Sequence, residues 1–335
     1  GIAAYERYPE PSVLDAGREA YAEAIRLTLD GGDVATAFAL IERSRGARAD
    51  ELSTVRQRLE GSGAAIVELA SLHDETIALL INANDAVAVR RVASVDRLLG
   101  ELPLRGVKTV FIVADPQLDG VALAASRLVE RVAVAFAPSA SALRRERAAR
   151  LRTIVAMAVA SRDLPSTREE LADLVRLYPQ PLASGGTFAS LVSGRADVIH
   201  ICGHAEGGSD TTLSFRGERV SSRRIAASPL QGAPLVLLSA CETLRAPRSP
   251  LRRTLSLGEG FLAAGARGVI GTLAPIPDND AREIFGRIHR HLAAGRGAAA
   301  ALRLAQLESM AVDRNGAWRS VALLTRTIDE DTEDS

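Results

Sequence analysis

Short apolar runs alternate with helical stretches along most of this 335-residue chain, and this alternation limits the possible folds most strongly. Runs of this kind are typical of strands buried on both faces of a parallel sheet. The runs lie at residues 106–115, 131–138, 153–161, 196–204, 234–241 and 268–276. Because helical patterns separate most of them, the sequence predicts an α/β fold built from two consecutive units.

Ahead of these runs, residues 12–60 show apolar side chains at helical spacing, for example Ala20, Ala24 and Leu27. The segment DGGD interrupts the pattern, so we expect a helix, a turn and a longer helix. A helical pair buries its apolar face poorly alone, which favours the end of a repeat array that continues upstream. The alternative is a self-contained arm packed on the main domain. Because the chain begins with Gly1, we expect it to lie inside a longer polypeptide.

These patterns divide the chain into four predicted segments. Residues 1–62 form the helical segment, and residues 63–150 form a first α/β unit that begins with three short strands, the last two joined as a hairpin near NAND. In this unit we also expect a helix over 119–130, and either a helix or a connector over 139–152. Residues 151–328 form a second α/β unit, and residues 329–335 an acidic tail.

Composition excludes several classes of function. The formal net charge is zero, which gives no argument for binding nucleic acid or a membrane surface, and no apolar run is long enough to cross a bilayer. The two cysteines are too few for a disulfide framework or a four-thiolate metal site. No HExxH, GxGxxG or GxxxxGK[ST] pattern occurs. We therefore expect neither metal nor cofactor, and a reducing, cytoplasmic location.

Two reactive side chains end apolar runs in the second unit. His204 follows ADVIHICG, and Cys241, 37 residues later, follows PLVLLSA. That spacing allows one crossover between parallel strands, whose carboxyl ends meet at one edge of a sheet. A histidine within reach of a thiol can take its proton, which creates a nucleophilic thiolate. The alternative from the residues alone is two ordinary core side chains.

The loops around these two residues also suit acyl-transfer chemistry. Gly203, Gly207 and Gly208 allow a substrate backbone to approach closely. Backbone N–H groups near Ala205 and Cys241 are candidates for an oxyanion hole.

Four segments resemble, in order and spacing, the CHAT domain family: DVIHICGHAEG, LVLLSACET, GEGFLAAGARGVIGTLAPIPDNDA and AAALRLAQL. The resemblance extends upstream through VFIVADPQLDGVALAASRL and covers residues 64–328. It implies a caspase-like catalytic unit behind a second, pseudo-caspase-like α/β unit, often preceded in the family by tetratricopeptide repeats. The function implied is that of a cysteine endopeptidase related to caspases and separases.

The motif match assigns His204 as the base and Cys241 as the nucleophile. His200 matches the first histidine of the motif and is expected to be a hydrogen-bonded core residue, like Cys202. Glu242 and Thr243 follow the nucleophile as in the family and are expected at most to hold the loop. Ala205 stands where the family usually has glycine, and Ala274 where it commonly has tryptophan.

The sequence indicates the substrate preference and the partners less directly than it indicates the histidine and the cysteine. Asp278 resembles the acidic position of separases, which cut after arginine, and a buried carboxylate is what a pocket for a basic side chain needs. Its alternative role is to cap the following helix. The expected partners are a protein substrate and an upstream helical repeat region or regulatory protein. The alternative function is a catalytically silent scaffold of the same fold.

Overall fold

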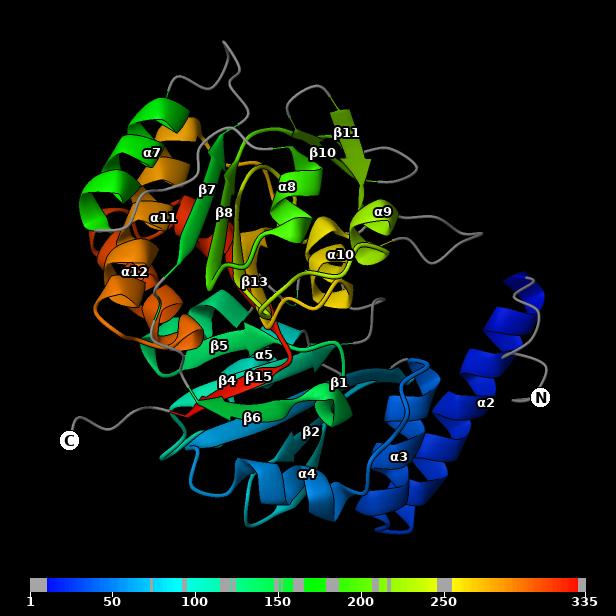
Figure 1. Ribbon diagram of the computed structural model, residues 1–335. Helices are drawn as coiled ribbons and strands as arrows, with labels where there is room; N and C mark the ends of the chain where they lie inside the picture. Colours follow the sequence, from blue (N-terminus) through cyan, green and yellow to red (C-terminus); the bar gives the residue numbers. More distant parts are fainter. Residues whose placement is uncertain are drawn as a thin grey trace. The chain divides into compact units, whose positions relative to one another are not determined.

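The computed structural model describes residues 11–330 except 73–74, 92–94, 115–120, 122–124, 148–150, 152, 159–165, 179–186, 207–210, 216–217 and 246–254. The chain divides into two compact units (Figure 1). Unit 1 comprises residues 1–145 and 250–253, and unit 2 comprises residues 146–249 and 254–335. The mixed α/β architecture predicted from the sequence is confirmed in both units.

Unit 1 contains helices and strands in this order: α2 (Pro11–Asp30), α3 (Val34–Ser44), α4 (Leu52–Leu59), β1 (Ala64–Leu72), β2 (Glu75–Ile81), β3 (Ala86–Arg91), α5 (Val95–Gly100), β4 (Thr109–Ala114), the 3-10 helix η1 (Ser126–Glu130), β5 (Ala133–Phe136) and the 3-10 turn η2 (Ala140–Ala142). Strand β6 (Arg144–Arg147) lies at the boundary between the units.

The sheet of unit 1 has the order β3-β2-β1-β4-β5. Strands β2 and β3 form the expected antiparallel hairpin, in which Asn82 Oδ1 accepts the N–H groups of Asn84 and Asp85. Strand β1 pairs antiparallel with β2 and parallel with β4, and β4 is parallel to β5. The near-continuous burial of β1 and β4 explains why their sequences lack an alternating polar face.

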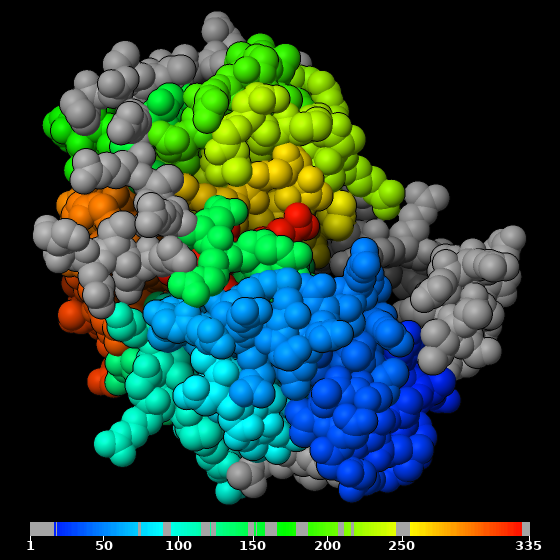
Figure 2. All heavy atoms as spheres, turned by 60° about the horizontal axis from the view of Figure 1, so that its bottom comes forward, coloured from blue at the N-terminus to red at the C-terminus, as the bar shows by residue number. Residues whose placement is uncertain are grey.

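The N-terminal segment is three helices, whereas the sequence pattern predicted two. Asp33 accepts the N–H of Thr36 and so caps α3. The long helix expected after it ends at Ser44, because the chain turns at Gly46 with φ +75°, a conformation that glycine adopts without strain. Helix α2 packs against α3 and strand β1. The space-filling view shows α2–α4, in dark to light blue, as a continuous layer on this face of unit 1 (Figure 2).

Two other expected segments of unit 1 also differ. Within the predicted helix 119–130, residues 115–120 and 122–124 lie outside the described part of the chain, and Ser126–Glu130 is a short 3-10 helix. The N–H groups of Arg131 and Val132 both donate to the carbonyl of Leu128. These bonds close the short helix, and β5 begins at the next residue, Ala133. Residues 144–147, expected in a helix or connector, are strand β6. Their helix-compatible composition is a weak preference that tertiary context overrides.

Unit 2 contains β7 (Ile154–Ala158), α7 (Ser166–Leu177), α8 (Phe188–Ser193), β8 (Val198–Cys202), β9 (Ala205–Glu206), β10 (Thr212–Phe215), β11 (Glu218–Ser221), α9 (Ser222–Ala226), β12 (Leu235–Ser239), α10 (Leu257–Ala263), β13 (Gly268–Thr272), α11 (Asp278–Ala293), α12 (Ala298–Val312), the 3-10 turn η3 (Ala317–Ser320), β14 (Val321–Thr325) and β15 (Thr327–Glu330).

The sheet of unit 2 has the order β7-β8-β12-β13-β14. Its first four strands are parallel, and β14 is antiparallel to β13. Helices α7, α11 and α12 cover one face and α8, α9 and α10 the other (Figure 1). The second face is apolar, with Ile199, Ile201 and Phe261 in its core. Strands β9, β10 and β11 form a small antiparallel sheet. Among the helices of the described residues, none is long and apolar enough to cross a membrane.

A buried charged cluster in unit 1 holds α3 on the sheet. The carboxylate of Glu42 accepts the N–H groups of Ala140 and Ser141, at 3.2 and 2.8 Å. Arg45 Nη1 lies 3.4 Å from Glu68 Oε2, but neither carboxyl oxygen of Glu68 makes a hydrogen bond among the described residues. Burial raises the pKa of Glu68 well above its ordinary value; Arg45 opposes this shift and Glu42 adds to it. The cluster is electrically balanced when Glu68 is protonated.

The substitution Glu68→Gln tests this cluster, since glutamine mimics the neutral acid. The stability that neutral Glu68 provides is present below the unfolded-state pKa of 4.5 and is lost as the pH rises through the raised folded-state pKa. We therefore expect Glu68→Gln to be more stable than wild type at neutral pH, with the advantage disappearing as the pH falls toward 4.5. Urea unfolding across this range measures the difference. The exposed control Glu60→Gln should show no such trend; an equal trend in both variants would refute the assignment.

Candidate active site

Strands β8 and β12 bring His204 and Cys241 to the same edge of the sheet. The two strands are parallel neighbours, and their register pairs Cys202 with Ser239. His204 lies two residues beyond Cys202, and Cys241 lies two residues beyond Ser239. Both residues therefore lie just past the carboxyl ends of adjacent strands, which are about 4.8 Å apart.

Both strand ends are held in place before the two side chains. The N–H of Gly203 donates to the carbonyl of Ser239 at 3.2 Å, which extends the pairing by one residue. His204 is half-buried, and Ala205 begins strand β9, where it pairs with Leu213. Cys241 is a free, half-buried cysteine, whereas Cys202 is fully buried. The expected loop residues Gly207 and Gly208 lie outside the described residues.

The turn after β12 carries Cys241 in an unusual backbone conformation. Glu242 adopts a left-handed φ of +53°, which is uncommon for a residue other than glycine. Such conformations persist only where the surroundings enforce them, and they cluster at functional sites. Within the described part of the chain, the N–H of Cys241 donates no backbone hydrogen bond.

Two threonines fix this turn to the neighbouring strand β13. Thr243 Oγ1 accepts the N–H of Thr272 at 3.0 Å, and Thr272 Oγ1 donates to the carbonyl of Ala240 at 2.6 Å. The N–H of Leu244 donates to the carbonyl of Thr272 at 2.9 Å. Thr243 thus holds the loop, as expected from its position two residues after Cys241.

Two glycines make room for the same turn. A Cβ at Gly271 would lie 2.4 Å from Thr243 Oγ1, and one at Gly258 would lie 2.4 Å from Leu244 Cδ2. Any larger residue at Gly271 would push Thr243 away from the strand. Gly258 and Gly271 are therefore packing requirements of the loop that carries Cys241.

Asp278 is the first residue of α11, but it does not cap that helix. Its Oδ2 accepts the N–H of Ser166 at 2.8 Å, at the start of α7. Asn279 Oδ1 accepts the hydroxyl proton of Ser166 at 2.8 Å. The N-cap of α11 is Pro277, which offers no side-chain bond. The contact with Ser166 thus links Asp278 to α7, a role that the sequence pattern does not predict.

Behind the strand ends lies a buried polar cluster that motif reasoning did not find. Glu170 of α7, Tyr178 and His289 of α11 surround His200 and Cys202 on the face of β8 toward α7 and α11. His200 Nδ1 lies 3.0 Å from His289 Nε2, and His200 Nε2 lies 3.0 Å from Cys202 Sγ. His200 is a buried, hydrogen-bonded residue, as expected.

Burial sets the protonation of this cluster. Desolvation, reinforced by Glu170, raises the pKa of Cys202 well above its ordinary value, so its thiol is not a ready nucleophile. Desolvation and the neighbouring His200 lower the pKa of His289 well below its ordinary value. Burial likewise raises the pKa of Tyr178. Each of these groups is therefore neutral near pH 7.

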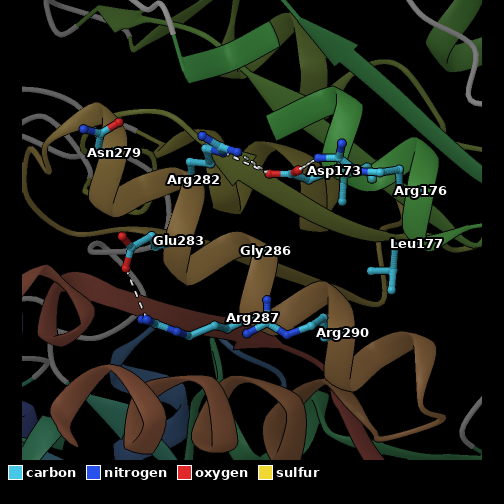
Figure 3. Close-up of a pocket in the computed structure, with 10 residues that line it drawn as sticks. Asp173, Arg176, Leu177, Asn279, Arg282, Glu283, Gly286, Arg287 and Arg290 are labelled. Carbon is cyan, nitrogen blue, oxygen red and sulfur yellow. Dashed lines mark hydrogen bonds and ion pairs between the residues drawn. The ribbon is translucent and has the colours of Figure 1, made fainter. Parts of the chain in front are cut away.

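A separate surface hollow of about 610 Å³ lies between α7 and α11, away from the candidate dyad (Figure 3). Asp173 projects into it between Arg176 and Arg282 and forms ion pairs with both. The arginines farther along α11, Arg287 and Arg290, are paired with Glu308. Neither His204 nor Cys241 lines this hollow.

Comparison with solved structures gives distant matches. The separase chain of the Saccharomyces cerevisiae separase–securin complex is similar with a TM-score of 0.46 and 13% identity, over 65% of this chain but only 15% of that chain. A complex of the pro- and mature domains of Porphyromonas gingivalis RgpB gives a TM-score of 0.49 and 10% identity, over 69% and 67% of the two chains. The Arg-specific cysteine proteinase gingipain R gives 0.48 and 9%, over 69% and 65%.

Sequence comparison is more decisive. No curated protein matches the chain. The family model of the CHAT domain matches residues 90–319, which is more than half of the chain and contains the histidine and cysteine motifs described above. The chain therefore belongs to the CHAT domain family.

Proposed function

We propose that this protein is a cysteine endopeptidase in which His204 is the general base and Cys241 the nucleophile. The observation that carries the proposal is the register of β8 and β12, which places both residues at equal offsets past neighbouring strand ends. Membership of the CHAT family supports the same chemistry. The half-buried thiol of Cys241, unlike that of Cys202, is accessible to a substrate.

The proposed reaction follows the usual order of covalent catalysis. His204 takes the thiol proton of Cys241, and the thiolate attacks the carbonyl carbon of the scissile peptide bond. The N–H groups of Cys241 and Ala205 donate to the oxyanion that forms. The C–N bond then breaks, His204 gives its proton to the leaving amine, and water hydrolyses the resulting thioester.

We also propose partners and a cellular location for this protein. The partners are a protein substrate and a helical repeat region or regulatory protein that acts through α2–α4. The packing of α2 on β1 supports a route from these helices to the sheet of unit 1. Two free cysteines suit a reducing, cytoplasmic compartment.

Covalent labelling tests the dyad directly. Peptidyl acyloxymethyl ketones with Arg, Leu or Asp next to the reactive group should modify Cys241 in wild type, and intact mass should show no label on Cys241→Ala. His204→Ala should slow labelling by about 10²–10⁴-fold, because the base no longer takes the thiol proton.

His291→Ala is the matched control for that experiment, since His291 is a partly exposed histidine whose ring pairs with Glu308 on the opposite helix. It should label at the wild-type rate. Absence of both labelling and peptide cleavage in wild type would instead favour the silent scaffold.

The threonine contacts predict that Thr272 positions Cys241. Thr272→Val leaves the buried carbonyl of Ala240 without its donor, which should lower the free energy of unfolding by about 1–3 kcal/mol. It should also slow labelling of Cys241. Thr325→Val is matched, because Thr325 Oγ1 donates to the carbonyl of Arg267 at 2.8 Å and accepts the N–H of Thr327 at 3.0 Å. We expect Thr325→Val to lose similar stability at an unchanged labelling rate; equal slowing in both variants would contradict a positioning role.

For the residue before the scissile bond we propose a basic preference set by Asp278. The bond from Ser166 N to Oδ2 fixes the carboxylate. Asp278→Asn keeps an acceptor for that N–H but removes the charge, so it should lose the preference for Arg over Leu probes. Asp280→Asn is the control, because Asp280 is exposed and lies two residues after Asp278. This variant should keep the preference for Arg over Leu probes. A preference that survives Asp278→Asn would assign Asp278 to holding α7 alone.

A further inference from the structure

Three different metal-binding side chains meet in the core of unit 2. Glu170, His200 and Cys202 are all buried, and their ligand atoms lie within 4.8 Å of one another. His200 Nε2 is 3.0 Å from Cys202 Sγ and 3.1 Å from Glu170 Oε1. His200 and Cys202 share one face of β8 because alternate residues of a strand point the same way. Helix α7 brings Glu170 to that face.

The contacts behind His200 are compatible with a tautomer that directs a lone pair at the cluster. Tyr178 Oη lies 3.2 Å from the carbonyl oxygen of His289 and 3.0 Å from His289 Nδ1. If the hydroxyl proton is donated to the carbonyl, the hydroxyl oxygen accepts the Nδ1–H of His289, and His289 Nε2 accepts the Nδ1–H of His200. In this tautomer the Nε2 lone pair of His200 is directed toward the thiol and the carboxylate.

That arrangement is the one found around metal-bound histidines. A ligating histidine almost always donates its other ring N–H to an acceptor that fixes the tautomer and the ring orientation. Here the chain from Tyr178 through His289 to His200 provides this support entirely within the core.

The carboxylate supplies an independent observation. Glu170 Oε2 accepts the hydroxyl of Ser239 at 3.2 Å, but Oε1 accepts no hydrogen bond from any described residue. Its 3.1 Å approach to His200 Nε2 is an ion-pair distance, yet it lies off the direction in which that nitrogen would donate. A simple histidine–glutamate ion pair therefore does not satisfy Oε1, although its side chain is only 5% exposed. Buried carboxylate oxygens without a partner are costly, so this atom points to a missing ligand.

We propose that Glu170, His200 and Cys202 bind one Zn²⁺ ion. The mixed set of thiolate, imidazole and carboxylate is typical of zinc. Binding replaces the thiol proton of Cys202, which leaves to solvent, and the thiolate and carboxylate together neutralise the two charges of the ion. A buried site gains from this neutrality because no net charge enters the core.

The geometry requires a small adjustment on binding. Zinc–nitrogen and zinc–sulfur bonds of about 2.0 and 2.3 Å in a tetrahedral site separate the two ligand atoms by about 3.5 Å. The nitrogen and sulfur must therefore move apart from their present 3.0 Å. The fourth position belongs to a water molecule or to the second carboxylate oxygen of Glu170. The ion would link α7 to β8 two residues before His204, without depending on the proposed peptidase activity.

The sharpest test uses Cys241→Ser, in which Cys202 is the only remaining thiol. After chelator treatment, Co²⁺ should produce a thiolate-to-cobalt charge-transfer band with one ion per chain, and Zn²⁺ should abolish the band and raise the melting temperature. The double variant Cys241→Ser/Cys202→Ser should show no band. Removing the outer support with His289→Phe should weaken Zn²⁺ binding by about 10–100-fold.

Zinc X-ray absorption on Cys241→Ser covers the case in which a variant does not fold. One sulfur at about 2.3 Å with nitrogen or oxygen ligands at about 2.0 Å supports the site. A first shell without sulfur, a missing cobalt band, or no metal bound at micromolar concentration would overturn it. A band that is present in wild type and lost in Cys241→Ser would place the metal at the candidate dyad and would also overturn the proposal.

Discussion

The parallel register between β8 and β12 is the constraint on which the candidate site depends. It pairs Cys202 with Ser239 and extends by one bond, from Gly203 N to the carbonyl of Ser239. A shift of one residue would turn every side chain of β8 to the opposite face. It would then expose the apolar side chains Ile199 and Ile201 to the polar cluster and bury His200 among α8–α10. The buried pattern of the two strands therefore fixes the register of the strand ends that precede His204 and Cys241.

The turn that carries Cys241 is stabilised from the side of β13 rather than from its own sequence. Glu242 holds a left-handed conformation that a free loop would leave, and the bonds between Thr243 and Thr272 enforce it. The absence of a Cβ at Gly271 lets Thr243 reach this position. Strain in the turn is thus offset by hydrogen bonds and close packing on a neighbouring strand.

Both units bury charged or titratable groups, with different consequences. In unit 1 the cluster of Glu42, Arg45 and Glu68 is balanced only when Glu68 takes up a proton. In unit 2 two histidines and a thiol share a buried cluster with Glu170, whose Oε1 has no hydrogen-bond partner among the described residues. Proton uptake is enough for the first cluster because Arg45 already supplies the positive charge. In the second, no described residue donates a hydrogen bond to Glu170 Oε1, which is why we propose a metal ion there.

The amino-acid sequence alone predicts the α/β class, the hairpin of β2 and β3, and the strands that end before His204 and Cys241. These features are local, because they depend on apolar runs and turn residues that are close together in the sequence. The sequence did not show the break near Gly46, the strand β6 or the 3-10 form of residues 126–130, since weak local preferences give way to tertiary packing. Only the tertiary structure brought Glu170, His200 and His289 together. His289 lies 89 residues from His200. The local sequence around either residue does not predict that α7 and α11 pack on the same face of β8.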